Sequence, residues 1–208
     1  DPALEVTESG NPETPADSSK LKPYLRSMAK GRPLTMDEFL KVTNATSIAT
    51  DLLNIIEVEG PISRSLLAKR IRERYELPKV SDKMEQQIEL ILNKPRPKTT
   101  KSGTLLIYWP AGVDPATYDS YRKTRGDDPD RSLGEIAPEE VIACIKELAM
   151  VPLSERSLVR ETTNALGYPR LNVDNENFIK SLLNVAVLNG DLEKNQQGLL
   201  ITRIQDGQ

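Results

Sequence analysis

The chain of 208 residues contains no histidine and a single cysteine, Cys144. Without imidazole, a His-based triad, general base or metal site cannot be built. One cysteine cannot form an internal disulfide, and without histidine it leaves no ligand set for zinc. Because Cys144 falls inside an apolar helical stripe, we expect a small core residue rather than a nucleophile.

Patterns that bind phosphates or span membranes are also missing. The eleven glycines are spread singly, and no GxxxxGK[ST] or strand-linked GxGxxG pattern occurs. No apolar run approaches the roughly eighteen residues of a membrane helix, and the N-terminus lacks the basic and apolar regions of a secretory leader. We therefore expect a noncatalytic, cytoplasmic protein with no cofactor, no small-molecule substrate and no membrane association.

What the chain does contain is an internal repeat. Residues 60–92 align with residues 151–183 at a constant offset of 91 residues and without a gap. The matched positions are Pro61 with Pro152, Ser63 with Ser154, Leu67 with Leu158, Pro78 with Pro169, Glu85 with Glu176, Ile88 with Ile179 and Leu92 with Leu183. Such a repeat predicts one supersecondary unit that is present twice.

A capping box and an apolar stripe mark the first two helices. Thr35 and Glu38 form the box, so a short helix is predicted to begin at Met36. The stripe of the second helix consists of Ile48, Leu52, Ile55 and Ile56. This helix is predicted to stop at Gly60 in a left-handed conformation.

Two more helices and a hairpin complete the first copy. After a short extended piece at Ile62, Ser63 is predicted to cap one helix, and Ser81 or Asp82 the next. The basic run 94–103 is predicted to be a long wing, and TLLIYW at 104–109 a strand. This order is that of a winged helix, in which a β-hairpin covers a three-helix core.

The second copy repeats this order with a shorter hairpin, in which DLEK and LLITR flank the turn NQQG. Pro138 begins its first helix, with Glu139 and Glu140 at the positive end of the helix dipole, and Gly167 and Gly190 stop the later helices. We expect a mainly α protein with small β-hairpins, of the α+β class, built as tandem duplicated winged-helix domains. The expected divisions are a flexible acidic linker or tail (1–34), a first module (35–110), a connector (111–134) and a second module (135–208).

Charge is distributed unevenly along the chain. Residues 1–19 hold five acids and no base, residues 64–101 hold eleven Lys or Arg against five acids, and residues 132–208 hold seven against eleven. A basic half of this kind is typical of a surface that meets a polyanion. A solvated helix face is the alternative explanation.

The basic wing carries the functional prediction. Its cations, Lys94, Arg96, Lys98 and Lys101, come without an acid between them, and the intervening prolines stiffen the loop. Four exposed cations suit a phosphate backbone, and a soluble flexible loop is the alternative. Lys79 and Lys83 complete the predicted set of nucleic-acid-binding residues.

The third helix of each copy is less suited to nucleic acid. In the first copy, the charge of Lys83 is outweighed by Asp82, Glu85 and Glu89, so we expect this helix to meet phosphates poorly. The third helix of the second copy carries Asp174, Glu176 and Lys180, which favours a protein surface or scaffolding.

Several short motifs resemble a known family. They are VEGPIS (58–63), the strand end Tyr108-Trp109-Pro110, EIAPEEV (135–141) and LVRETTNALGYPRL (158–171). Over Ile48 to Ile201 the chain resembles the uncharacterised domain numbered 3320 among the domains of unknown function, which closes many large bacterial helicase-like proteins. The resemblance implies the C-terminal end of a superfamily I helicase that also carries an endonuclease-like domain, and it brings no catalytic residue. Ser81 and Asn172 stand where this family leads us to expect a glycine before the third helix.

Two functions remain open. The first is a noncatalytic tandem winged-helix module that binds DNA, or RNA, for helicase or nuclease domains on the same polypeptide or on another protein. The second is a protein-docking module of the same assembly without direct nucleic-acid contact. Binding that weakens steeply with salt separates the first from the second.

Overall fold

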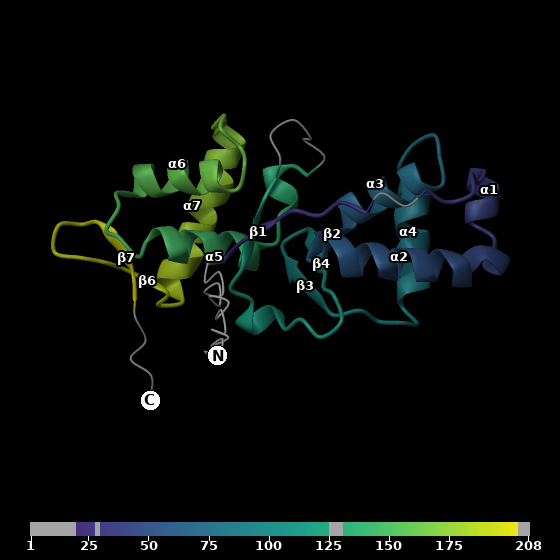
Figure 1. Cartoon of the computed structure of the whole chain (residues 1–208), viewed down its shortest axis with the longest axis horizontal. Helices are drawn as coiled ribbons and strands as arrows, with labels where there is room; N and C mark the ends of the chain where they lie inside the picture. The colour runs from purple at the N-terminus through teal and green to yellow at the C-terminus, as the bar shows by residue number, and fades with distance from the viewer. Residues whose placement is uncertain (1–19, 28–29, 125–130, 204–208) are drawn as a thin grey trace, which may run out of the picture.

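The structure is a computed structural model that describes residues 20–27, 30–124 and 131–203. The acidic stretch 1–19, predicted to be a linker, lies outside the described residues. Two groups of helices lie side by side along the long axis of the molecule, each with its own small sheet (Figure 1). The α+β class expected from the sequence is confirmed.

The first half begins with two helices that the sequence anticipated. The elements are α1 (Met36–Phe39), a 3-10 turn (Val42–Asn44), α2 (Ala45–Glu59), β2 (Ile62–Ser63), α3 (Arg64–Arg74), α4 (Asp82–Leu92), β3 (Thr99–Ser102) and β4 (Leu105–Tyr108). Thr35 and Glu38 form both hydrogen bonds of the predicted capping box. The side chains of Ser63 and Ser81 cap α3 and α4 by accepting a hydrogen bond from a backbone N–H in the first turn.

The predicted long wing, residues 94–103, is divided in the structure. Residues 94–98 form a loop, whereas Thr99–Ser102 is the strand β3, paired antiparallel with β4 over four residue pairs. The hairpin turn is only Gly103 and Thr104, and Gly103 has a φ of 59°. The β-branched threonines favour a strand, and pairing satisfies their backbone groups, so the free loop is shorter than the sequence suggested.

The second half has the same order of helices. Its elements are α5 (Pro138–Leu148), α6 (Glu155–Ala165), α7 (Val173–Leu188), β6 (Leu192–Lys194) and β7 (Leu200–Thr202), and Leu153 bridges to Leu200 as a further extended position. The starts of α3 and α6 are 91 residues apart, as are those of α4 and α7. Asn172 caps α7 through its side chain, as Ser81 caps α4. The two positions before the third helices, where a glycine was expected, therefore hold helix-capping residues.

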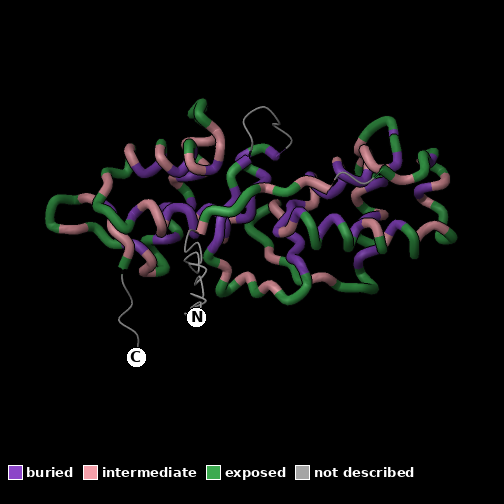
Figure 2. Tube along the Cα trace, in the orientation of Figure 1, coloured by how far each residue is buried: buried purple, intermediate pink, exposed green. Residues whose placement is uncertain are grey.

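Each half encloses its own apolar core, visible as the buried segments of Figure 2. The positions that the repeat pairs are all buried: Leu67 with Leu158, Ile88 with Ile179, and Leu92 with Leu183. Cys144 is fully buried in the second core, as predicted. The helical phasing inferred from the sequence is therefore confirmed at these positions.

The two halves are joined by a pair of strands that the sequence did not reveal. β1 (Leu21–Pro23) pairs in parallel with β5 (Tyr121–Lys123). Along the chain, β5 lies between two 3-10 turns, Pro115–Thr117 and Leu133–Glu135. Beyond β1, the N-terminal segment runs along the first half toward α1 (Figure 1). There the N–H groups of Gly31 and Leu34 donate to the carbonyls of Arg74 and Tyr75. Residues 20–27 and 30–34, which the predicted division assigned to the linker (1–34), thus contact the folded part of the chain.

The three glycines predicted to stop helices are required for different structural reasons. Gly167 and Gly190 have φ values of 95° and 77°, as expected of left-handed helix stops. Gly60 is instead extended, with φ −70° and ψ 153°. A Cβ at Gly60 would lie 2.3 Å from the carbonyl oxygen of Ile56 and 2.6 Å from the ring of Pro110. The close approach of the chain, not the backbone angle, requires glycine there.

Candidate nucleic-acid interface

The six cations predicted to bind nucleic acid do not form one surface. Lys79 and Lys83 lie at the N-terminal end of α4, whereas Lys94 and Arg96 follow its C-terminal end. Because α4 has eleven residues, about 16 Å of helix separates these groups at about 1.5 Å per residue. Lys98 and Lys101 lie farther along, beside and on the hairpin.

The loop after α4 is folded back onto the end of the helix. The N–H of Arg96 donates to the carbonyl of Leu92 at 2.9 Å, and its Nε to the carbonyl of Asn93 at 3.1 Å. Arg96 has a φ of 42°, a left-handed conformation that is unusual for a residue with a side chain. The guanidinium is thereby fixed at the negative end of the helix dipole, where a cation is favoured.

Lys98 is directed toward the connector rather than left free. Its Nζ donates to the carbonyl of Val113 at 3.4 Å and lies 3.9 Å from a carboxylate oxygen of Asp114. Both side chains of the pair are more than half exposed, so the pair is weak. Lys98 is therefore partly engaged by the connector.

Lys94, Arg96 and Lys101 form no ion pair with any residue in the described part of the chain. Lys101 lies opposite Leu106 in the β3–β4 register, so both side chains emerge on the same face of the hairpin. That face looks onto α4, because Leu106 and α4 residues line one groove. Lys79 and Lys83 are likewise exposed and form no ion pair with the described residues, but they lie at the other end of α4. Lys94, Arg96 and Lys101 are therefore the available cations on the hairpin side of this helix.

The outward face of α4 is acidic and already engaged. Arg64, at the start of α3, lies 3.5 Å from a carboxylate oxygen of Glu85 and forms a second ion pair with Glu89. The hydrogen bond to Glu89 raises the pKa of the Arg64 guanidinium above its usual value. One arginine shared between two carboxylates leaves this face acidic, as the sequence indicated.

A groove of about 730 Å³ lies between α4 and the β3–β4 hairpin. Its lining comprises Gln86, Glu89, Leu90, Leu92, Asn93, Arg96, Pro97, Thr99, Leu106 and Tyr108. Leu90 is 68% exposed although it is a large apolar residue. Tyr108 is only 4% exposed, and burial raises the pKa of its hydroxyl to about 12. Sequence reasoning missed this groove, and its one signal was that Leu90 lies off the apolar stripe of its helix.

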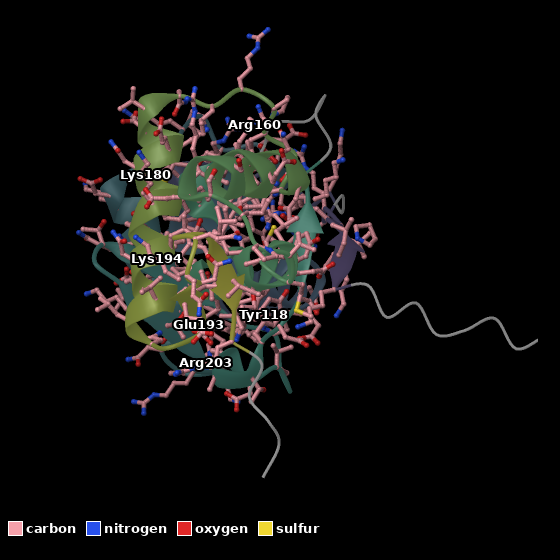
Figure 3. All side chains as sticks on the ribbon, turned by 90° about the vertical axis from the view of Figure 1, so that its left-hand side faces the viewer. Tyr118, Arg160, Lys180, Glu193, Lys194 and Arg203 are labelled. Atoms are coloured by element: carbon pink, nitrogen blue, oxygen red, sulfur yellow. The ribbon has the colours of Figure 1, made fainter. Side chains whose placement is uncertain are left out.

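In the second half, Arg156, Arg170 and Lys194 form no ion pair with the described residues, whereas other cations are paired. Lys180 pairs with Glu176 at 2.7 Å, and Arg203 lies 3.4 Å from Glu193. The labelled cations lie apart from one another at this end of the molecule (Figure 3).

A buried ionic cluster connects the two halves. We call it the junction cluster; it consists of Tyr24, Glu59, Arg70, Arg122, Arg131 and Glu140. Arg122 donates to the carbonyls of Glu59 and Gly60 at 2.6 and 2.9 Å and of Pro61 at 2.8 Å. It also binds Glu140 at 2.7 Å, and Arg131 binds the same carboxylate at 3.1 Å. Arg122 therefore joins the end of α2 to the start of α5.

Glu140 has no contact with solvent, and two arginines bind its carboxylate. Burial alone would raise the pKa of this carboxyl, but Arg122 and Arg131 outweigh it and hold the pKa below its usual value. Placement at the helix dipole, the explanation drawn from the sequence, is therefore incomplete for Glu140. The guanidinium carbons of Arg122 and Arg131 also lie 5.4 and 4.4 Å from the centre of the Tyr24 ring.

Beside the junction cluster, the single tryptophan is enclosed between the halves. Trp109 is 1% exposed and packs with Ile107 and Ala137. Its ring meets that of Tyr118 edge to face at 5.1 Å, and its Nε1 donates to the hydroxyl of Thr100 at 3.0 Å. The fluorescence of Trp109 should therefore change when the contact between the two halves is lost.

Within residues 20–27, 30–124 and 131–203, no group of three or more carboxylate or cysteine side chains is arranged to hold a metal ion. In the same ranges, no helix is long and apolar enough to cross a membrane.

Residues 37–86 match the family model described as "Protein of unknown function (DUF3320)". The matched stretch extends from α1 into α4 and contains the junction residues Glu59 and Arg70. It confirms the resemblance to this domain, over a shorter stretch than the Ile48 to Ile201 expected from the motifs. Comparison with curated proteins and with solved structures found no match.

Proposed function

We propose that the chain is a noncatalytic tandem winged-helix module that binds nucleic acid, preferentially duplex DNA, through its phosphate backbone. Lys94, Arg96 and Lys101 are its contact residues. It would act for helicase or nuclease domains on the same polypeptide or on another protein.

The order of elements supports the winged-helix part of this proposal. In the first half a helix, a short strand, two helices and a hairpin follow one another, with the strand order β2-β4-β3. The second half has a helix, a bridged extended position at Leu153, two helices and a hairpin. The second and third helices of the two halves start at the same offset of 91 residues, which supports a duplicated unit.

The observation that carries the nucleic-acid part is the unpaired state of Lys94, Arg96 and Lys101 within the described residues. Each cation that meets a phosphate releases condensed counterions, which favours binding without regard to base sequence. Lys98 contributes less, because it already contacts Val113 and Asp114.

The acids of α4 restrict how a duplex would be bound. Glu85 and Glu89 share one arginine, so insertion of α4 into the major groove would bring carboxylates toward phosphates. We therefore propose that the hairpin and the loop 94–98 contact the backbone, while α4 stays outside the groove. Such contacts position a protein on DNA but do not read its sequence.

A second candidate is the docking of a protein segment. It is favoured by a different observation, the exposed apolar side chain of Leu90 beside the groove between α4 and the hairpin. Exposed apolar surface of this kind is typical of interaction sites when it lies in a concave region.

A titration of labelled DNA tests the proposed function. The full chain is mixed with a twenty-base-pair duplex and with its single strand, at roughly 50 and 200 mM salt. We expect binding to the duplex at low salt that weakens steeply at the higher concentration. No binding at the lower concentration would exclude the proposal, while salt-independent binding would point away from phosphate contacts.

A further inference from the structure

The groove between α4 and the β3–β4 hairpin combines an apolar floor with a charged rim. Leu90 from the helix, Leu106 from the hairpin and Pro97 from the loop between them all line it. Its volume of about 730 Å³ is within the range typical of ligand-binding sites. Leu106 is half-buried and Leu90 is largely exposed, so apolar surface remains uncovered.

The unpaired charge around this groove is positive. Arg96 lines it, and Lys101 emerges beside Leu106 on the same face of the hairpin. On the opposite wall, Glu89 is ion-paired with Arg64. A ligand therefore meets unpaired cations on the hairpin side and, on the helix side, a carboxylate that shares its arginine with Glu85.

We propose that this groove binds a segment of a partner protein in which large apolar side chains are flanked by Asp or Glu. The apolar side chains would cover Leu90 and Leu106, and the carboxylates would meet Arg96 and Lys101. This inference rests on the docking candidate above and adds the chemistry of the partner. Main-chain shape is not specified, because both helical and extended segments bind in grooves of this type.

The apolar floor distinguishes a peptide from a nucleic acid as the occupant. Single-stranded nucleic acids bind grooves by stacking bases on exposed aromatic rings, but Tyr108, the aromatic residue of the lining, is buried. Leucine side chains offer no stacking face, whereas they gain favourable free energy when another apolar side chain excludes water from them. Lys101 and Arg96 are shared with the proposed DNA contacts, so peptide and duplex would exclude one another.

The test is a selection of random twelve-residue peptides on the immobilised full chain. We expect the recovered peptides to be enriched in Leu, Ile or Phe together with Asp or Glu. Their binding is then measured on Leu90→Ser, which removes the exposed apolar side chain, and on Arg96→Gln with Lys101→Gln. Leu188→Ser is the matched control, because Leu188 is 84% exposed on α7 in the other half.

Leu90→Ser should weaken peptide binding at least about ten-fold, as expected for the loss of a buried leucine contact. The double charge variant should weaken it by about two- to five-fold, and Leu188→Ser should have no effect. The inference is overturned if no peptide is recovered, if the recovered peptides are basic, or if they bind Leu90→Ser as tightly as the parent. Duplex binding by the same variants separates the two functions, because Leu90→Ser removes no charge and should leave DNA affinity unchanged.

Discussion

Replacing Arg122 with methionine should destabilise the protein and loosen the contact between its halves. The side chain is buried and donates to three backbone carbonyls at the end of α2, as well as to Glu140 on α5. Methionine fills a similar volume but donates nothing, so the carbonyls and part of the Glu140 carboxylate lose their partner. Removing one member of a buried ion pair costs about 3–5 kcal/mol of unfolding free energy, and we expect a loss of this size.

Urea unfolding measures this effect with two signals. Trp109 fluorescence reports on the contact between the halves, and far-UV circular dichroism reports on the helices of both. In the parent we expect the two signals to change together, whereas in Arg122→Met the fluorescence should change at lower urea than the dichroism. Arg160→Met is the control, because Arg160 is exposed and its pair with Glu161 is weak. If the unfolding free energy of Arg122→Met lies within about 0.5 kcal/mol of that of the parent, the range of ordinary surface substitutions, this account of the junction is refuted.

Three further predictions concern stability. Acid should destabilise the protein, because the folded-state pKa of Glu140 lies below its usual value of 4.5. The stability that the ionised Glu140 contributes is present above pH 4.5 and is lost as the pH falls through the folded-state pKa. Glu140→Gln should therefore flatten the pH dependence of the melting temperature below pH 4.5. Gly60→Ala should lower the melting temperature through the collision with Ile56, whereas Gly134→Ala, in open space, should not; equal melting temperatures would contradict this. Leu67→Ala should cost about 2–5 kcal/mol in chemical denaturation, and a cost below about 1 kcal/mol would mean that its site is not close-packed.

The helices and their cores were predictable because they depend on local pattern. Apolar spacing placed Leu67 and Leu158 on buried faces, and capping residues such as Thr35 and Ser63 marked helix starts. Each of these signals lies within a few residues of the feature that it determines. For the same reason the repeat was visible without any structure.

The junction was not predictable, because it depends on contacts between residues far apart in sequence. Arg122 and Arg131 lie in a stretch without periodicity, and nothing near them indicates that both meet Glu140 inside the protein. The pairing of β1 with β5 joins segments 100 residues apart, such as Leu21 with Tyr121. Every residue except proline has the backbone groups for such hydrogen bonds, so the amino-acid composition does not indicate which segments will pair.

The candidate site was predicted in part. The sequence singled out the cations Lys94, Arg96, Lys98 and Lys101, but it placed them on one free loop. In the structure Thr99–Ser102 pairs with β4 and Lys98 contacts Asp114, so the four cations are divided between a loop and a strand and one of them is partly engaged. The groove beside them needs two elements to face each other, which no single stretch of sequence shows.

The central claim is tested most directly by the salt dependence of duplex binding in a triple variant, Lys94→Gln, Arg96→Gln and Lys101→Gln. If each residue contacts a phosphate, the slope of log affinity against log salt should become shallower by about 0.9 per contact, or about 2.7 in all. A control in which Lys22, Lys41 and Lys194 are changed to Gln has the same net charge and should keep the slope of the parent. Equal slopes for the triple variant and the control would contradict the claim that these three residues hold the DNA backbone.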